Sequence, residues 1–176
     1  VNLIKELRNK TGAGFLDCKV ALKENNNVID DAVDYLRKKG LAKASKKTSR
    51  EANEGAIGVY HNNDFCIFIK VNSETDFAAK GETFLNFLDE LGNHALSFNN
   101  LDELNKDSFL SSKLKNYTVQ DYFNEMIAKI GENLILSDFI AFSKKINSIS
   151  FYIHNSYRKN IGKIISLIEY QSSNND

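Results

Sequence analysis

The chain has 176 residues, is 42% hydrophobic and has a net charge of zero, a composition that excludes a wholly disordered protein and allows one core with a small satellite domain. The charge is uneven, because residues 1–50 hold 12 Lys and Arg against 6 Asp and Glu; this excess suits docking to an acidic surface and is too small to indicate direct nucleic-acid binding. No apolar run approaches the roughly 20 residues that cross a bilayer, so we expect no membrane contact.

Residues 1–40 predict three short helices. The first ends at the glycine-bearing turn of residues 11–14, the second covers residues 15–24, and the third covers residues 28–39. Residues 41–54 are rich in Lys and Ala and poor in large apolar side chains, which is typical of a linker with some helical character. We therefore expect a compact three-helix domain at 1–40 and a basic linker at 41–54.

The third helix has the clearest pattern, since its apolar residues are spaced three and four apart along one face. Asn27 and Asp30 resemble a capping pair at its start, and Gly40, preceded by three basic residues, predicts its end. The positions expected to face the core are Ile29, Ala32, Val33 and Leu36.

From Gly55 the apolar period changes to two, which predicts a β-hairpin. Strands at residues 56–60 and 65–71 flank a polar turn at 61–64. The second strand is rich in Ile and Phe, as buried strands are, and it stops at polar residues that lead into a helix. It thus delivers residues 75–77 to a strand-to-helix turn, where rigid scaffolds often carry functional side chains.

Two interpretations of this turn are open on the residues alone. In the first, Thr75 or Asp76 caps the following helix and Phe77 packs inward as a hydrophobic staple. In the second, the Asp76 carboxylate and the Phe77 ring are presented for function. Caps are commoner than functional sites, so local chemistry alone favours the first.

Two amphipathic helices are predicted after the turn, separated by residues 99–116, which are polar and give no clear prediction. Thr118 and Asp121 predict the start of the second of these helices, and Gly131 predicts its end. The expected buried positions are Phe84, Phe87, Leu88, Leu91 and Ala95 in the first helix, and Val119, Phe123, Met126, Ile127 and Ile130 in the second.

The rest of the chain predicts a strand at 134–142 and a second hairpin. The hairpin strands at 150–154 and 161–170 flank a turn at 155–160, and their spacing repeats that of the first hairpin, which indicates an internal duplication. The expected fold class is therefore α+β. An antiparallel hairpin sheet covered by helices forms a first core half at 55–146, and an incomplete second core half at 147–176 contains a hairpin only.

The residues that could carry chemistry have no spacing typical of a metal or catalytic site. Cys18 and Cys66 stand far apart without a CxxC motif, which indicates reduced thiols, and they form no zinc-ligand pattern with His61, His94 or His154. Neither thiol has a recognisable base beside it in sequence, and no phosphate loop is present. We expect no metal, no cofactor and no enzymatic activity.

Four stretches nevertheless form a specific set. They are residues 4–22, with Thr-Gly-Ala-Gly inside them, the helix end at 36–40, the turn at 71–80, and Lys-Ile-Gly-Glu-Asn at 129–133. One such motif would be weak evidence, but four in the same order along almost the whole chain resemble translation elongation factor Ts. The resemblance implies that the three-helix domain is ubiquitin-associated-like and that the core is built from two similar halves.

The resemblance also implies a function and a site. Members of this family are guanine-nucleotide exchange factors of elongation factor Tu, and their Thr-Asp-Phe-Val signature corresponds to Thr75, Asp76, Phe77 and Ala78 here, with Ala in place of Val. The signature implies that these residues disturb the magnesium ion bound to the partner GTPase and so promote GDP release.

By the same resemblance, Arg8, Phe15 and Leu16 on the three-helix domain bind the partner's nucleotide domain; Met-Met is common in the family where this chain has Phe15 and Leu16. The implied partner is elongation factor Tu, GDP-bound or nucleotide-free, in the cytoplasm or an organelle matrix. The incomplete second half would fit a natural short form, a fragment, or a homodimer that completes its core.

Two alternatives stay open at this point. A three-helix domain with a basic linker could belong to a ubiquitin-associated-type adaptor at the ribosome, which would use the apolar pair Phe15 and Leu16 in a groove. A degenerate protein that binds elongation factor Tu without promoting exchange is the other. The Thr75-Asp76-Phe77 turn distinguishes an exchange factor from the adaptor, because an adaptor does not need this turn.

Overall fold

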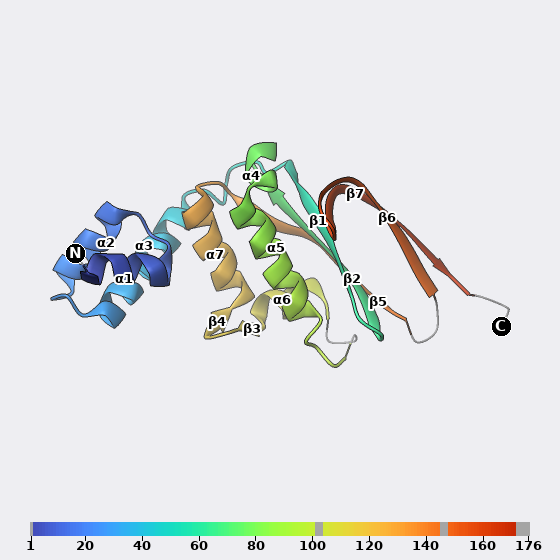
Figure 1. The fold of residues 1–176 in the computed structure, drawn as a ribbon, viewed down its shortest axis with the longest axis horizontal. Helices are drawn as coiled ribbons and strands as arrows, with labels where there is room; N and C mark the ends of the chain where they lie inside the picture. Colours follow the sequence, from blue (N-terminus) through green and yellow to red (C-terminus); the bar gives the residue numbers. More distant parts are fainter. Residues whose placement is uncertain (1, 101–103, 145–147, 172–176) are drawn as a thin grey trace.

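The computed structural model describes residues 2–100, 104–144 and 148–171. Along its longest axis a bundle of three helices is followed by a sheet covered by further helices and then by a hairpin of long strands (Figure 1). The antiparallel sheet with helices packed on it confirms the predicted α+β class.

The amino-terminal bundle consists of α1 (Asn2–Thr11), α2 (Phe15–Glu24) and α3 (Ile29–Ser45), so the three predicted helices are present. Each helix contacts the other two, and together they enclose a small apolar core. The buried members of this core are Leu7, Cys18, Ala21, Leu22 and Ala32.

The predicted capping pair and the predicted carboxyl-terminal end of the third helix are both wrong. The helix starts after Val28, which makes no side-chain capping bond, and Asn27 has a left-handed backbone with φ 63°. The helix also continues past Gly40 to Ser45, into the predicted linker. Gly40 faces α7 (Val119–Ile130), where an added Cβ would lie 3.5 Å from the Cβ of Ala128. Packing against α7 thus extends a helix that the local pattern would have ended, because tertiary contacts override weak local signals.

The central sheet has five antiparallel strands in the order β5-β2-β1-β7-β6. Its middle is the predicted first hairpin, β1 (Glu54–His61) and β2 (Phe65–Ser73), and the predicted strand β5 (Leu134–Ser143) pairs with β2. β2 is buried along nearly its whole length, since the helices cover one face and the second hairpin packs on the other. Burial on both faces explains why its sequence is almost continuously apolar.

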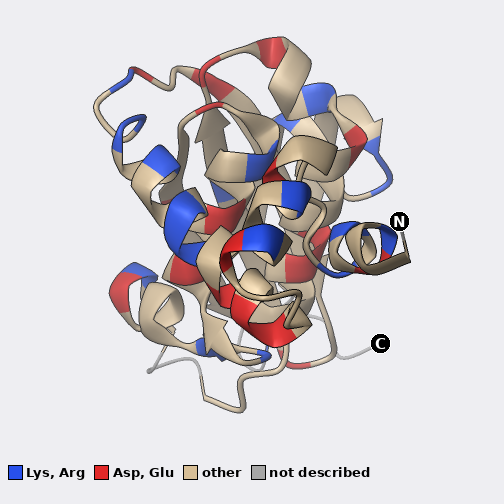
Figure 2. Cartoon of the chain, turned by 90° about the vertical axis from the view of Figure 1, so that its left-hand side faces the viewer, with Lys and Arg blue, Asp and Glu red and all other residues tan. Residues whose placement is uncertain are grey.

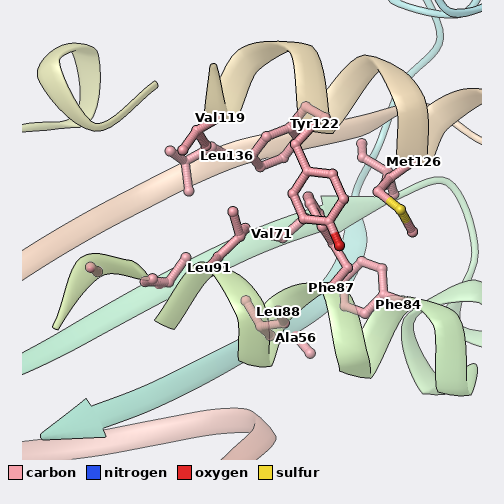
Figure 3. Packing of buried hydrophobic residues seen from close by; sticks show 14 of the residues in the cluster. Ala56, Val71, Phe84, Phe87, Leu88, Leu91, Val119, Tyr122, Met126 and Leu136 are labelled. Atoms are coloured by element: carbon pink, nitrogen blue, oxygen red, sulfur yellow. The ribbon is translucent and has the colours of Figure 1, made fainter. Parts of the chain in front are cut away.

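Two helices supply most of the layer over the sheet, α5 (Glu82–Ala95) and α7. Their facing side chains fill the space above β2 and β5, where Figure 3 shows Phe87 next to Tyr122. Phe87 meets the rings of Tyr122 and Phe123 edge on, with centroids 4.9 Å apart in each pair. Burying each large apolar side chain contributes about 1.5–3 kcal/mol. The predicted stripes of both helices are buried, except that Ile130 is only partly so.

The ends of α7 follow the sequence signals. Thr118 and Asp121 form a reciprocal capping box, and Gly131 ends the helix with a left-handed φ of 90°. A left-handed residue at this position strongly favours glycine, which has no Cβ to strain.

Residues 99–116, for which no clear prediction was possible, contain regular structure in their described part; residues 101–103 lie outside that part. Phe109 is fully buried and stacks on Phe139 with centroids 4.6 Å apart. A capping box at Asn105 was the available local signal for a helix here. The elements in this stretch are α6 (Lys106–Ser111) and β3 (Lys113–Leu114), and β3 pairs with β4 (Tyr117–Thr118) directly after the stretch.

The second hairpin consists of β6 (Ser148–Arg158) and β7 (Ile161–Tyr170), so the predicted turn at 155–160 is wrong. The true turn is only Lys159 and Asn160, and a register shift between Ser156 and Arg158 lets β6 continue through this region. The turn was predicted too early because Asn155 and Ser156 are residue types that favour turns. In the structure both lie at exposed positions of β6.

This hairpin extends the same sheet as the first one. β7 pairs with β1 only at Ile57↔Gly162 and Gly58↔Ile161, and the hairpin then packs on the face of the sheet opposite the helices. The side chains in that contact are Val59, Cys66 and Phe68 on the sheet and Ile149, Ile165 and Leu167 on the hairpin. The boundary between core halves predicted at residue 146 lies outside the described residues.

Candidate functional site

The turn after β2 is built by hydrogen bonds that begin at the end of the strand. Ser73 donates its hydroxyl to the carbonyl oxygen of Thr75 at 2.8 Å, and the extended Thr75 accepts the Ala78 amide on its Oγ1 at 3.2 Å. Thr75 is therefore the N-cap of α4 (Asp76–Lys80), which confirms the capping prediction for Thr75 and not for Asp76.

Phe77 points outward from this turn, so the prediction that it packs as an inward staple is wrong. Its side chain is 83% exposed, whereas Ala79 on the same short helix is fully buried against the core. Ala78 is intermediate. A single exposed aromatic ring is ordinary on a protein surface. This ring differs in standing on a capped turn at the end of a buried strand.

Asp76 lies beside Phe77 and pairs with Lys80 one helical turn later, Nζ to Oδ2 at 2.7 Å. The hydrogen bond from Lys80 lowers the pKa of Asp76 from its ordinary value, and the same bond raises the pKa of Lys80. Asp76 is thus ionised at neutral pH, with its side chain 44% exposed. The Asp76 carboxylate and the Phe77 ring therefore lie next to each other on the solvent-exposed surface.

A second turn, which follows α7, accepts hydrogen bonds from Thr75. The Glu132 carboxylate accepts the Thr75 backbone amide on Oε2 at 3.0 Å and the Thr75 hydroxyl on Oε1 at 2.7 Å. These contacts join residues 57 positions apart in the chain. Thr75 is therefore fixed both to its own helix and to the end of α7.

Asn133 ties the same turn to two further segments. Its backbone amide donates to Glu74 at 2.6 Å, and its side-chain amide donates to the carbonyl oxygen of Arg50 at 2.7 Å. Asn133 is only 1% exposed, so these bonds satisfy polar groups that would otherwise be costly to bury. Glu132 and Asn133 belong to the Lys-Ile-Gly-Glu-Asn stretch that contributes to the family resemblance, but the sequence alone predicted no role for either side chain.

The three-helix bundle carries the other predicted site residues. Arg8 and Phe15 line one hollow of about 340 Å³, and Phe15 is 51% exposed. Leu16 follows it in α2 and is 74% exposed. The structure thus places Arg8 and Phe15 together, with Leu16 on the open surface of the same bundle.

The basic excess of this bundle is partly neutralised locally. Lys39 and Lys43 both bind Asp17, at 3.0 and 3.1 Å, and Figure 2, which faces this end of the molecule, shows basic segments interleaved with acidic ones. Segments of both charge signs therefore alternate along the chain at this end of the molecule.

The two groups of predicted residues do not form one site. Figure 1 places α4 above the sheet and α1 and α2 at the far end of the molecule, with α3 and the segment after it between them. A partner that contacts both groups would have to span this distance.

The described residues include no group of three or more His, Cys, Asp or Glu placed to hold a metal ion. Both thiols are buried, and burial raises the pKa of Cys18 and of Cys66, so neither is activated as a thiolate. In the described part of the chain no helix has the length and hydropathy of a membrane span.

Comparison with known proteins identifies the family. The family model described as elongation factor TS matches residues 74–176. Elongation factor Ts of Trichlorobacter lovleyi is 45% identical over 170 residues, which are 94% of this chain and 52% of the relative. Those of Methylobacterium sp. and Rickettsia typhi are each 41% identical, over 98% of this chain and 56% and 55% of their own lengths. The chain thus spans about half the length of these relatives, and it belongs to the elongation factor Ts family.

Proposed function

We propose that this chain promotes release of GDP from elongation factor Tu and so acts in translation elongation as a guanine-nucleotide exchange factor. The observation that carries the proposal is the 83% exposed ring of Phe77 beside the ionised Asp76 on a doubly tethered turn. Membership of the elongation factor Ts family supports the choice of partner.

The mechanism is a difference in binding and needs no covalent step. An exchange factor accelerates release by binding the nucleotide-free GTPase better than the loaded one, and by reciprocity the nucleotide weakens the factor's binding by the same ratio. In such GTPases a Mg²⁺ ion bridges the phosphates and a protein hydroxyl, so nucleotide affinity depends strongly on its coordination. Phe77 acts as a wedge that shifts side chains packed near this ion, and Asp76 competes for hydrogen bonds there; Thr75 and Ala78 shape the turn.

The three-helix bundle supplies a second contact. Arg8, Phe15 and Leu16 hold the nucleotide domain of the partner, since they combine a cation with two exposed apolar side chains. Burying these apolar groups gives affinity, whereas the turn at Phe77 gives the selective weakening of nucleotide binding. Binding and exchange are therefore carried by different parts of the chain.

The same proposal covers the organisation of the chain. The three helices up to Ser45 form a ubiquitin-associated-like domain, the basic segment after them links it to a core half at 55–146, and 147–176 contribute to a second, similar half. A factor of this kind works where ribosomes do, in the cytoplasm or an organelle matrix, and needs no cofactor of its own. The adaptor function is not favoured, because it gives no role to the turn at Phe77.

The test is stopped-flow release of a fluorescent GDP from elongation factor Tu, with and without the chain. We expect micromolar chain to accelerate release in millimolar Mg²⁺, and the factor of acceleration to shrink when EDTA has already removed the ion. Release that is equally fast with and without the chain would refute the proposal. An acceleration that EDTA leaves unchanged would retain exchange but refute the role of the magnesium ion.

A further inference from the structure

We propose that Glu132 is a positioning residue, which holds the Thr75 turn so that the Phe77 ring is presented in one orientation. The inference deepens the proposed exchange function and rests on it. Glu132 lies at the end of α7 and touches neither Phe77 nor Asp76 in any hydrogen bond of the described structure. Its effect would pass through Thr75.

The Glu132 carboxylate fixes the direction of the capping hydroxyl. Thr75 has a single hydroxyl proton, which goes to Glu132 Oε1 at 2.7 Å and leaves the oxygen lone pairs free for the Ala78 amide at 3.2 Å. The second carboxylate oxygen accepts the Thr75 amide at 3.0 Å. One carboxylate side chain therefore determines both the backbone position and the hydroxyl rotamer of the cap.

Glu132 is itself held from both sides. Lys47 donates a hydrogen bond to the carbonyl oxygen of Gly131, and the neighbouring Asn133 binds Glu74 and the carbonyl oxygen of Arg50. Two crossing contacts, Glu132 to Thr75 and Asn133 to Glu74, thus fasten the turn before α4 to the turn after α7. The carboxylate is prearranged for Thr75 and does not have to be ordered when a partner arrives.

Phe77 needs this support because little else orients it. α4 has only five residues, too few to form a stable helix without external contacts, and most of the Phe77 side chain touches no other part of the chain. The position of the ring follows from the cap at Thr75 and from the buried Ala79. Loosening the cap would let the ring move while the buried core stays filled.

The decisive experiment is a double-mutant cycle in the exchange assay. Glu132→Gln keeps the shape of the side chain but replaces one acceptor oxygen with a donor, so it cannot accept one bond from Thr75 on each of its two terminal atoms as the carboxylate does. We expect it to lower the exchange rate at saturating chain by about tenfold in the parent, and by less than about twofold in a Phe77→Ala background, because a positioning group has nothing left to position. The concentration giving half of the maximal rate is expected to change by less than about threefold.

Other outcomes of the cycle are equally informative. An equal factor in both backgrounds, or an effect on the half-maximal concentration alone, would overturn the positioning role while the parent's own exchange activity still supports the proposed function. Asp138→Asn is the matched control, since this carboxylate lies on β5 in an exposed pair with Lys70 at 3.5 Å. Asp138→Asn should change neither the exchange rate at saturating chain nor the half-maximal concentration.

A measurement that does not depend on exchange provides the second test. With 4-fluorophenylalanine at position 77, the fluorine resonance of the parent should differ from that of a free ring, and Glu132→Gln should move it toward the free-ring value and narrow the line. Glu132→Asp, which is shorter by one methylene, should give an intermediate spectrum if its fold is retained. A resonance that neither variant changes would overturn the proposal.

Discussion

Arg158 of β6 donates a hydrogen bond from Nη1 to Oδ2 of Asp89 on α5 at 2.7 Å, which fastens the second hairpin to the helical layer. The other oxygen of Asp89 accepts the Tyr60 hydroxyl at 3.2 Å and the Asn160 side-chain amide at 3.1 Å. Arg158 also reaches Glu82 and Asn86 on α5. The hairpin, whose backbone pairing with β1 covers only two residue pairs, is thus anchored largely by side chains.

Arg158→Ala should lower the melting temperature by several degrees, because it removes the hairpin's main polar anchor to α5. Arg158→Lys should restore little of the loss, since an ammonium group cannot reproduce the planar fork that binds separate acceptors. Thermal unfolding followed by circular dichroism measures both. Lys115→Ala, which breaks an exposed pair with Glu90 at 3.1 Å, is the control and should have almost no effect.

The same chemical change at two helix glycines should have opposite effects. At Gly92 an added Cβ would lie 2.3 Å from ring atoms of Tyr60, so Gly92→Ala should lower the free energy of unfolding by about 1–3 kcal/mol. At Gly40 the nearest atom is the Cβ of Ala128 at 3.5 Å, an ordinary contact inside a continuous helix. Gly40→Ala should raise the free energy of unfolding by about 0.5–1 kcal/mol.

Urea titration of the two variants gives these values directly. Gly40→Ala also tests the course of α3, because a glycine that ended the helix in a left-handed conformation would make this substitution destabilising. A loss of stability at Gly40 would therefore contradict the continuous helix.

His94 should make stability depend on pH near neutrality. Its Nε2 lies 2.8 Å from the Ser112 hydroxyl and its ring packs against Phe109, and burial lowers its pKa from the ordinary 6.5. The unfolded chain then binds the proton more readily, so this contribution to stability is complete above about pH 6.5 and is lost as the pH falls through the lowered value.

Urea titrations at pH 7.5 and pH 5.5 test this expectation. The difference in unfolding free energy between the two pH values should be smaller in His94→Gln than in the parent, and His154→Gln, at an exposed position on β6, should leave it unchanged. An equal difference in the parent and in His94→Gln would contradict it.

The elements that the sequence predicted well are those whose signals lie within one helix or one hairpin. Thr118 with Asp121, Gly131, and the apolar stripe from Phe84 to Ala95 are all read over a few residues. Such signals state which residues can be buried together. They do not state which distant segment will cover them.

The features that the sequence did not predict depend on distant partners. α3 runs past Gly40 because α7 packs there, and Glu132 meets Thr75 across 57 positions. The site was predicted only in part for a related reason: on a helix of five residues no periodic pattern can tell whether Phe77 or Ala79 faces the core. The family resemblance favoured an outward Phe77, and local chemistry did not.

Leu16→Asp should separate binding from exchange in the proposed complex. Leu16 is 74% exposed, so a charge there should leave the fold intact and weaken the contact with elongation factor Tu. In a titration of exchange rate against chain concentration, we expect a half-maximal concentration raised by about tenfold or more and an unchanged maximal rate. Ile168→Asp, at a 65% exposed position on β7, is the control, and a Leu16 variant indistinguishable from it would argue against a contact through α2.

The central claim is that the exposed ring of Phe77 loosens the nucleotide of the partner. The most direct test is the rate of fluorescent GDP release from elongation factor Tu at saturating chain, measured for the parent, Phe77→Ala and Tyr152→Ala, the last being an exposed ring on β6. We predict that Phe77→Ala lowers this rate by about tenfold or more at an unchanged melting temperature, and that Tyr152→Ala matches the parent. A Phe77→Ala variant that releases GDP as fast as the parent, or that melts several degrees lower with normal release, would contradict the account.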